Sequence, residues 1–168
     1  MNSLHYGIAI RITNRRGAFY TARDEMDKLS ITLNRKNKVY YFNDLSIDKN
    51  KLSQLEFVIF FDTNSNSFYF GETEKIDARK YPYVPNDYSS YNDEKPSPHK
   101  TWILLKSLVP IRSSFLKNIY VYGETSFYNY GGFKTQKTLE DKMTEPRFPR
   151  VYVFINDHYY KRINDNVL

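Results

Sequence analysis

The feature that most constrains this chain is a hydrophobic run followed by turn residues and a second hydrophobic run. Residues 55–62 read Leu-Glu-Phe-Val-Ile-Phe-Phe-Asp, residues 68–72 read Phe-Tyr-Phe-Gly-Glu, and the residues between them all favour turns. β-Branched and aromatic residues favour strands, so this segment predicts a β-hairpin. Because residues 57–61 are apolar at every position, both faces of the first strand must be covered, which places it centrally in a sheet.

Other short segments suit strands or short helices. A chain of 168 residues suits one domain, here 1–168. The number of expected strands and helices predicts a β-rich α+β domain. We expect a twisted, barrel-like sheet of six or seven strands with two or three short helices. Expected strands lie at 6–13, 30–38, 39–42, 101–106, 119–122 and 151–155, and expected helices at 21–29, 113–118 and 136–143.

Two segments lack the regular spacing of apolar residues that indicates a strand or a helix, and they are predicted to be long loops. Residues 81–99 hold four prolines and several tyrosines, and residues 123–137 are rich in glycine, aromatic residues and lysine. Loops of this length within compact domains are usually functional or disordered. They are therefore the first places to look for a binding surface.

The composition excludes several classes of site. The chain has no cysteine, and its three histidines are scattered at positions 5, 99 and 158, so we expect no disulfide, metal or cofactor. P-loops, nucleophile elbows and dinucleotide fingerprints are absent, and no catalytic residue is predicted. Without a signal peptide or an apolar stretch long enough to span a bilayer, the sequence predicts a cytoplasmic protein with no membrane partner.

The net charge of +6 is unevenly distributed. Residues 1–38 hold 8 Lys and Arg against 3 Asp and Glu, residues 39–99 hold 6 against 10, and residues 100–168 hold 11 against 6. A fold that brings the basic ends together would create a positive face for a polyanion. A solvated surface in a basic proteome explains the charge equally well.

Aromatic residues interleaved with cations in the two loops are the strongest functional pattern. Bases stack on exposed rings, while lysine holds phosphates. An AT-rich coding sequence would also raise the tyrosine content, but it explains the clustering less well. The candidate residues are Tyr83, Tyr88 and Tyr91 in the first loop, and Tyr128, Tyr130, Lys134 and Lys137 in the second.

The order of elements over residues 57–122 resembles the PUA-like superfold, in particular its EVE and YTH branch. The match consists of a strand, a turn, a strand ending in Gly71-Glu72, a proline-rich loop, and the strand that begins at Trp102. The resemblance implies a small barrel that binds DNA or RNA, with modified-base recognition in McrB-type restriction systems. It further implies an aromatic cage drawn from Trp102, Tyr83, Tyr88 and Tyr128, and phosphate contacts from Arg15, Arg16 and Lys134.

The sequence therefore favours a nucleic-acid-binding domain, with DNA favoured over RNA, within a larger restriction or defence assembly. One alternative is a small magnesium-dependent nuclease using the hairpin carboxylates, such as Asp62 and Glu72. The spacing Glu74-Lys75 does not fit a (D/E)xK motif, because Thr73 stands two residues before the lysine. The other alternative is a protein-interaction module of phage or mobile-element origin, since tyrosine is enriched at interfaces.

Overall fold

The computed structural model describes residues 3–12, 22–43, 51, 54–62, 65–77, 88–89, 101–127, 134–145 and 148–168. Over these residues the chain forms ten strands, one long helix and several short helical segments. The strands are β1 (Leu4–Arg11), β2 (Val39–Asn43), β3 (Leu55–Asp62), β4 (Ser67–Asp77), β5 (Tyr88–Ser89), β6 (Thr101–Leu105), β7 (Val109–Ile111), β8 (Ile119–Phe127), β9 (Lys134–Thr138) and β10 (Arg150–Asn156). The helical segments are α1 (Ala22–Lys36), η2 (Ser113–Asn118), α3 (Leu139–Lys142), α4 (Asp157–Tyr160) and η3 (Ile163–Asn166).

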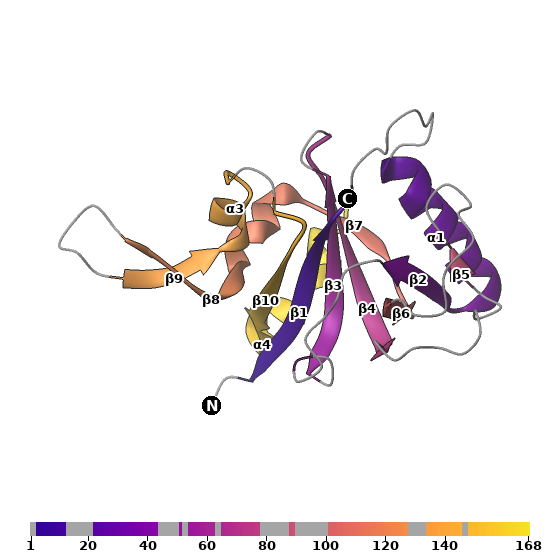
Figure 1. The fold of residues 1–168 in the computed structure, drawn as a ribbon, viewed down its shortest axis with the longest axis horizontal. Coiled ribbons are helices and arrows are strands. Elements are labelled where there is room, and N and C mark those ends of the chain that lie inside the picture. Colours follow the sequence, from indigo (N-terminus) through magenta and orange to yellow (C-terminus); the bar gives the residue numbers. More distant parts are fainter. Residues whose placement is uncertain are drawn as a thin grey trace.

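All ten strands belong to one open, twisted sheet (Figure 1). The order is β5-β2-β6-β4-β3-β1-β10-β8-β9, with β7 paired to β4 beside this path. The pairs β1–β3 and β2–β5 are parallel, and the others are antiparallel. The β-rich α+β class is confirmed. The barrel-like sheet of six or seven strands is wrong, because the edge strands β5 and β9 lie at opposite ends and do not pair.

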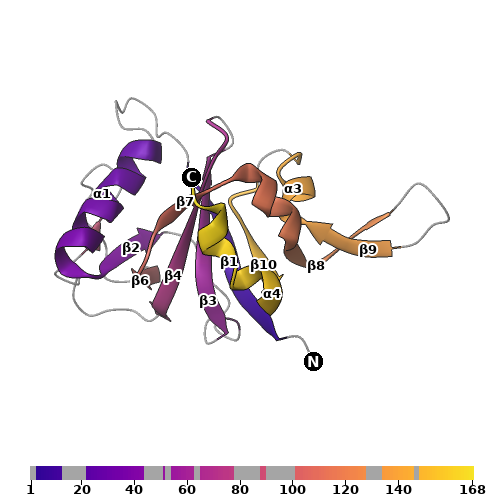
Figure 2. The ribbon, with the colours of Figure 1, turned by 180° about the vertical axis from the view of Figure 1, so that it is seen from behind.

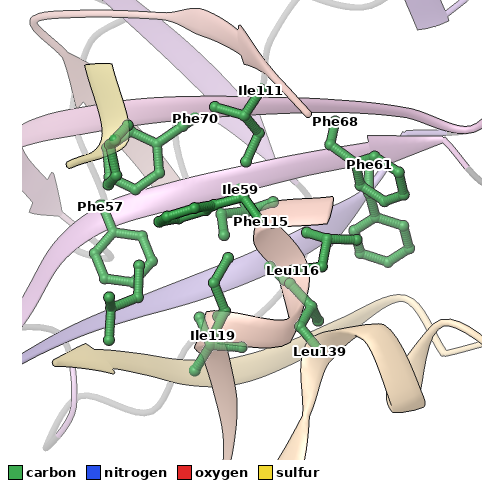
Figure 3. Packing of buried hydrophobic residues seen from close by; sticks show 14 residues of the cluster. Phe57, Ile59, Phe61, Phe68, Phe70, Ile111, Phe115, Leu116, Ile119 and Leu139 are labelled. Carbon is green, nitrogen blue, oxygen red and sulfur yellow. The ribbon is translucent and has the colours of Figure 1, made fainter. Parts of the chain in front are cut away.

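Strand β3 lies near the middle of the sheet, as its uninterrupted apolar run predicts. Its residues from Phe57 to Phe61 are all fully buried. Val58 and Phe60 face one hydrophobic cluster, which contains Met26 and Leu29 of α1. Phe57, Ile59 and Phe61 face the other cluster, shown in Figure 3, which contains residues of η2, α3 and η3. In Figure 2, α4 lies in front of the sheet on this second side.

Helix α1 is longer than its sequence suggests, and the predicted strand at 30–38 is wrong. Met26, Leu29 and Leu33 follow helical spacing and place one stripe against the first cluster. This tertiary contact outweighs the modest preference of Ile31 and Thr32 for strands. The helix ends at Lys36, and the next residue, Asn37, takes a left-handed φ of 60° while its amide donates to the carbonyl of Leu33 at 2.8 Å.

Two later segments also differ from expectation. Residues 134–138 form β9 at the sheet edge, so the predicted helix at 136–143 is confined to Leu139–Lys142. Thr138 caps it by accepting a hydrogen bond from the Asp141 amide, while the Asp141 carboxylate accepts from the Thr138 amide.

Among the described residues, no helix is long and apolar enough to cross a membrane.

Gly7 is required by the packing of β1 against β3. A Cβ atom at this position would collide with the ring of Phe57, which fills the space beside the backbone. We therefore expect Gly7→Ala to lower the free energy of unfolding by about 1 to 3 kcal/mol, as overpacking of a tight core does. Urea unfolding checks this. The double variant Gly7→Ala/Phe57→Leu should be less destabilised than the sum of the single changes, and an unchanged midpoint for Gly7→Ala would contradict the packing argument.

Candidate aromatic binding face

Strands β1, β10 and β8 carry a row of aromatic side chains on one face of the sheet. Alternate side chains of a strand share a face, and the register aligns Tyr6 with Phe154 and Phe154 with Tyr120. The same alternation adds Tyr152 and Tyr122. We call this set the aromatic face: Tyr6, Tyr120, Tyr122, Tyr152 and Phe154. It lies on the side of the sheet that faces the first hydrophobic cluster, opposite the second cluster and α4.

The rings of the aromatic face contact one another but are not fully covered. Tyr120 and Phe154 stack with centroids 5.5 Å apart, and Tyr6 meets Tyr122 edge to face at 6.1 Å. All five residues are partly exposed, and Tyr122 is the most exposed of them at 49%. Helix α1 belongs to the cluster that buries Ile8 and Ile10 further along the same side of β1, and of the five rings Tyr152 packs partly against that cluster. The face is thus a pre-formed aromatic surface open to a ligand.

A pocket of about 210 Å³ opens within the aromatic face. Its position coincides with an irregularity in the pairing of β1 and β3, where the register shifts between Tyr6 and Gly7. Gly7 has no side chain and Val153 turns its side chain into the second cluster, so their backbone lines part of the pocket together with the side chain of Leu55. The lining residues are Tyr6, Gly7, Lys51, Gln54, Leu55, Tyr122, Tyr152 and Val153.

Lys51 brings a positive charge into this pocket. Its Nζ lies 4.3 Å from the ring centroid of Tyr152 and 4.8 Å from that of Tyr122, within the range of cation–π attraction. The backbone near it is held by a hydrogen bond from the Gln54 amide to the Lys51 carbonyl at 3.0 Å. The lysine therefore occupies the pocket through contacts with aromatic rings.

A second cation lies on the same side of β10. Arg150 pairs with Ile10 in the register, one pleat along the strand from Tyr152, and its Nη1 is buried with no hydrogen-bond partner in the described part of the chain. A buried donor without a partner is costly. The aromatic face is therefore bordered by an arginine with an unused hydrogen-bond donor nitrogen.

Two of the aromatic residues expected from sequence, Trp102 and Tyr88, lie in the described part of the chain, and both belong to strands. Trp102 is fully buried, and its ring meets Tyr40 edge to face at 6.4 Å, so its surface is not open to a base. Tyr88 forms β5 with Ser89, inside the predicted loop 81–99, and pairs with Tyr40 of β2. The remaining candidates Tyr83, Tyr91, Tyr128, Tyr130, Arg15 and Arg16 lie outside the described residues.

The predicted phosphate-binding lysines lie on β9. The structure gives the backbone of Lys134 there but not its side chain. Lys137 is 18% exposed and forms ion pairs with Glu145 and with Glu124, the latter at 3.5 Å. Glu124 and Glu145 also pair with Lys142, at 2.9 and 2.7 Å. Two lysines thus face two glutamates, and the positive charge of Lys137 is balanced within the protein.

The carboxylates proposed for a nuclease do not converge. Asp62 pairs with Ser67 at one end of the hairpin, whereas Glu72 pairs with Phe57 five positions away. At about 3.4 Å per residue, this separation is roughly 17 Å, far beyond the distance over which two groups share a metal ion. Among the described residues, no group of three or more His, Asp and Glu side chains could hold a metal.

His5 lies in a cluster of titratable side chains at the start of β1. Its Nδ1 lies 2.8 Å from Glu56 Oε2 and its Nε2 2.9 Å from Asp157 Oδ1, while Tyr160 stacks on the ring at 3.9 Å. Burial raises the pKa of the Tyr160 phenol to about 12, and nearby carboxylates add to the shift. Because both ring nitrogens of His5 are engaged, the cluster joins α4 to β1 and β3.

Asp157 gives this junction a measurable pH dependence. A hydrogen bond from Lys161 at 2.6 Å and another from His5 lower the pKa of the Asp157 carboxyl. Its ionised form therefore stabilises the fold above the ordinary carboxyl pKa, and this stabilisation is lost as the pH falls through the lowered value. We expect urea unfolding to show wild type more stable than Asp157→Asn at neutral pH, with the difference vanishing in acid. The exposed Asp165→Asn serves as control, and a difference independent of pH would contradict this assignment.

Comparison of this chain with protein-family models, with curated proteins and with solved structures finds no match. The chemistry of the aromatic face must therefore be argued from its own residues. These are five contiguous rings, a pocket among them, and two cations beside them.

Proposed function

We propose that this domain binds single-stranded nucleic acid on its aromatic face. The observation that carries the proposal is the tyrosine-lined pocket of about 210 Å³ that contains the Lys51 ammonium. Bases stack on exposed aromatic rings, and cations beside the rings hold the phosphates. Sheet surfaces that carry two or three exposed rings are a recurrent way to bind splayed bases.

The arrangement of the rings favours a single strand over a duplex. Tyr120 of β8 stacks on Phe154 of the neighbouring strand β10, and Tyr6 of β1 meets Tyr122 of β8 across β10. Stacking requires access to the flat face of a base, which a paired duplex hides within its own stack. Two bases of an extended strand could lie across β8, β10 and β1, with the pocket receiving one of them.

The charge of the chain suits a polyanion. Lys51 lies within the pocket and Arg150 borders the aromatic face, in a chain of net charge +6. Cytoplasmic location, a preference for DNA over RNA and membership of a restriction or defence assembly remain parts of the proposal. The nucleic-acid interface proposed here does not require the PUA-like barrel.

Binding should be measurable with a fluorescent oligothymidine by anisotropy. We expect binding at low salt, with the logarithm of the association constant falling linearly with the logarithm of the salt concentration as counterions are released. Tyr122→Ala should weaken binding at least about fivefold, since one stacked base contributes about 1 to 3 kcal/mol. Because Tyr122 is 49% exposed, the loss of its ring should leave the fold intact.

Two matched variants separate stacking from general charge. Tyr122→Phe keeps the ring and should bind nearly as well as wild type. Lys117→Met removes an exposed cation on η2, a segment associated with the opposite cluster, and should weaken binding less than Lys51→Met. If the wild-type protein binds no oligonucleotide at low salt, the proposed function is wrong.

A further inference from the structure

We propose that the pocket of the aromatic face selects a nucleobase that carries a fixed positive charge, as N-methylation of a ring nitrogen produces. This inference rests on the proposed function and names the ligand class of the same site. It starts from the way Lys51 is held. Its ammonium lies 4.3 and 4.8 Å from two tyrosine centroids, and no carboxylate lines the described pocket.

The pocket therefore holds a cation through ring faces. The negative faces of tyrosine rings attract a cation even when no anion is present. Tyr6 adds a third ring, which meets Tyr122 at an interplanar angle of 74°, so the rings lie in different planes around the space. A ligand that enters must displace the Lys51 side chain and replace the attraction that is lost.

A charged base meets this requirement better than a neutral one. Exchange of the ammonium for a cationic ring keeps a positive charge against Tyr122 and Tyr152, and it adds stacking area. A neutral base stacks but gives up the cation–π attraction. The displaced lysine, on its flexible stem, can then reach a phosphate of the same strand.

The size of the pocket and the charge of the protein decide between ligand classes. At about 210 Å³ the pocket is smaller than the roughly 300 to 1,000 Å³ of sites that enclose whole drug-sized ligands, which suits a single ring. A trimethylated lysine offers the same kind of cation. Histone-like basic peptides, however, would approach a chain of net charge +6, whereas a nucleic acid is attracted to it. We therefore commit to a methylated base.

The test compares nucleosides, which carry no phosphate. NMR titrations of the full chain with 7-methylguanosine and guanosine, at mildly acidic pH where the methylated ring is cationic, give the two dissociation constants. We expect the methylated nucleoside to bind about tenfold more tightly, the factor that a cation–π contact supplies. Tyr122→Leu and Tyr152→Leu should each reduce this preference, while Tyr122→Phe should retain it.

Lys51→Met gives a readout that general base stacking does not predict. The substitution removes the competing and repelling cation, so it should tighten 7-methylguanosine binding, whereas it should weaken binding of the oligothymidine. Lys117→Met should leave the nucleoside affinity unchanged. Opposite changes in the affinities for the nucleoside and for the oligothymidine distinguish a cation-selective pocket from a lysine that only binds phosphate.

Several outcomes would overturn the inference. Equal affinities for the two nucleosides would do so while leaving oligonucleotide binding, and the proposed function, intact. Tighter binding of a trimethyllysine peptide than of 7-methylguanosine would assign the pocket to a peptide instead. Weaker 7-methylguanosine binding by Lys51→Met would also contradict the exchange of one cation for another.

Discussion

Burial of β3 on both of its faces is the constraint on which the rest of the structure depends. A strand that is apolar at five successive positions cannot face water on either side. Met26 and Leu29 of α1 cover Val58 and Phe60, while η2, α3 and η3 supply cover for the other side. The two hydrophobic clusters lie on opposite faces of the sheet, and β1 likewise contributes to both, with Ile8 and Ile10 in the first and Ala9 in the second.

The aromatic face exists because this cover is uneven. Helix α1 is long enough to shield Ile8 and Ile10, but the row from Tyr6 to Tyr122 lies beyond it at the other end of the sheet. The opposite face at these strands is covered, since Ile119, Val153 and Ile155 all belong to the second cluster. One end of one face is consequently left with aromatic residues, which tolerate partial exposure because their rings are amphipathic at the hydroxyl.

Parts of this fold could be predicted from the sequence because they depend on local pattern. The hairpin of β3 and β4 follows from two β-favouring runs around turn residues, and β2, β6 and β10 follow from similar runs. The sequence predicts a shorter helix than α1 because Ile31 and Thr32 favour strands locally. The contacts of Met26, Leu29 and Leu33 that stabilise the full helix are non-local. The open sheet could not be predicted, since strand order and closure depend on pairings between segments far apart in the chain.

The aromatic face lies in other elements than the two loops that the sequence indicates as a binding surface. Clusters of tyrosine in loops directed attention to residues 81–99 and 123–137, most of which lie outside the described residues. The signal that locates the aromatic face is the alternation of aromatic with aliphatic residues in Ile119-Tyr120-Val121-Tyr122 and in Val151-Tyr152-Val153-Phe154. One side of each strand enters the core and the other carries rings. Only the pairing of β10 with both β8 and β1 brings these rings together with Tyr6.

The position of β1 between β3 and β10 has a consequence for how the chain reaches this state. One neighbour of β1, the strand β10, is synthesised only after the strands β2 to β9 that lie between them in the chain. Until then β1 presents an unpaired edge, and pairing across such a sequence separation is intrinsically slow. The interval is a period of risk for association with other chains, and the aromatic face is assembled only when it ends.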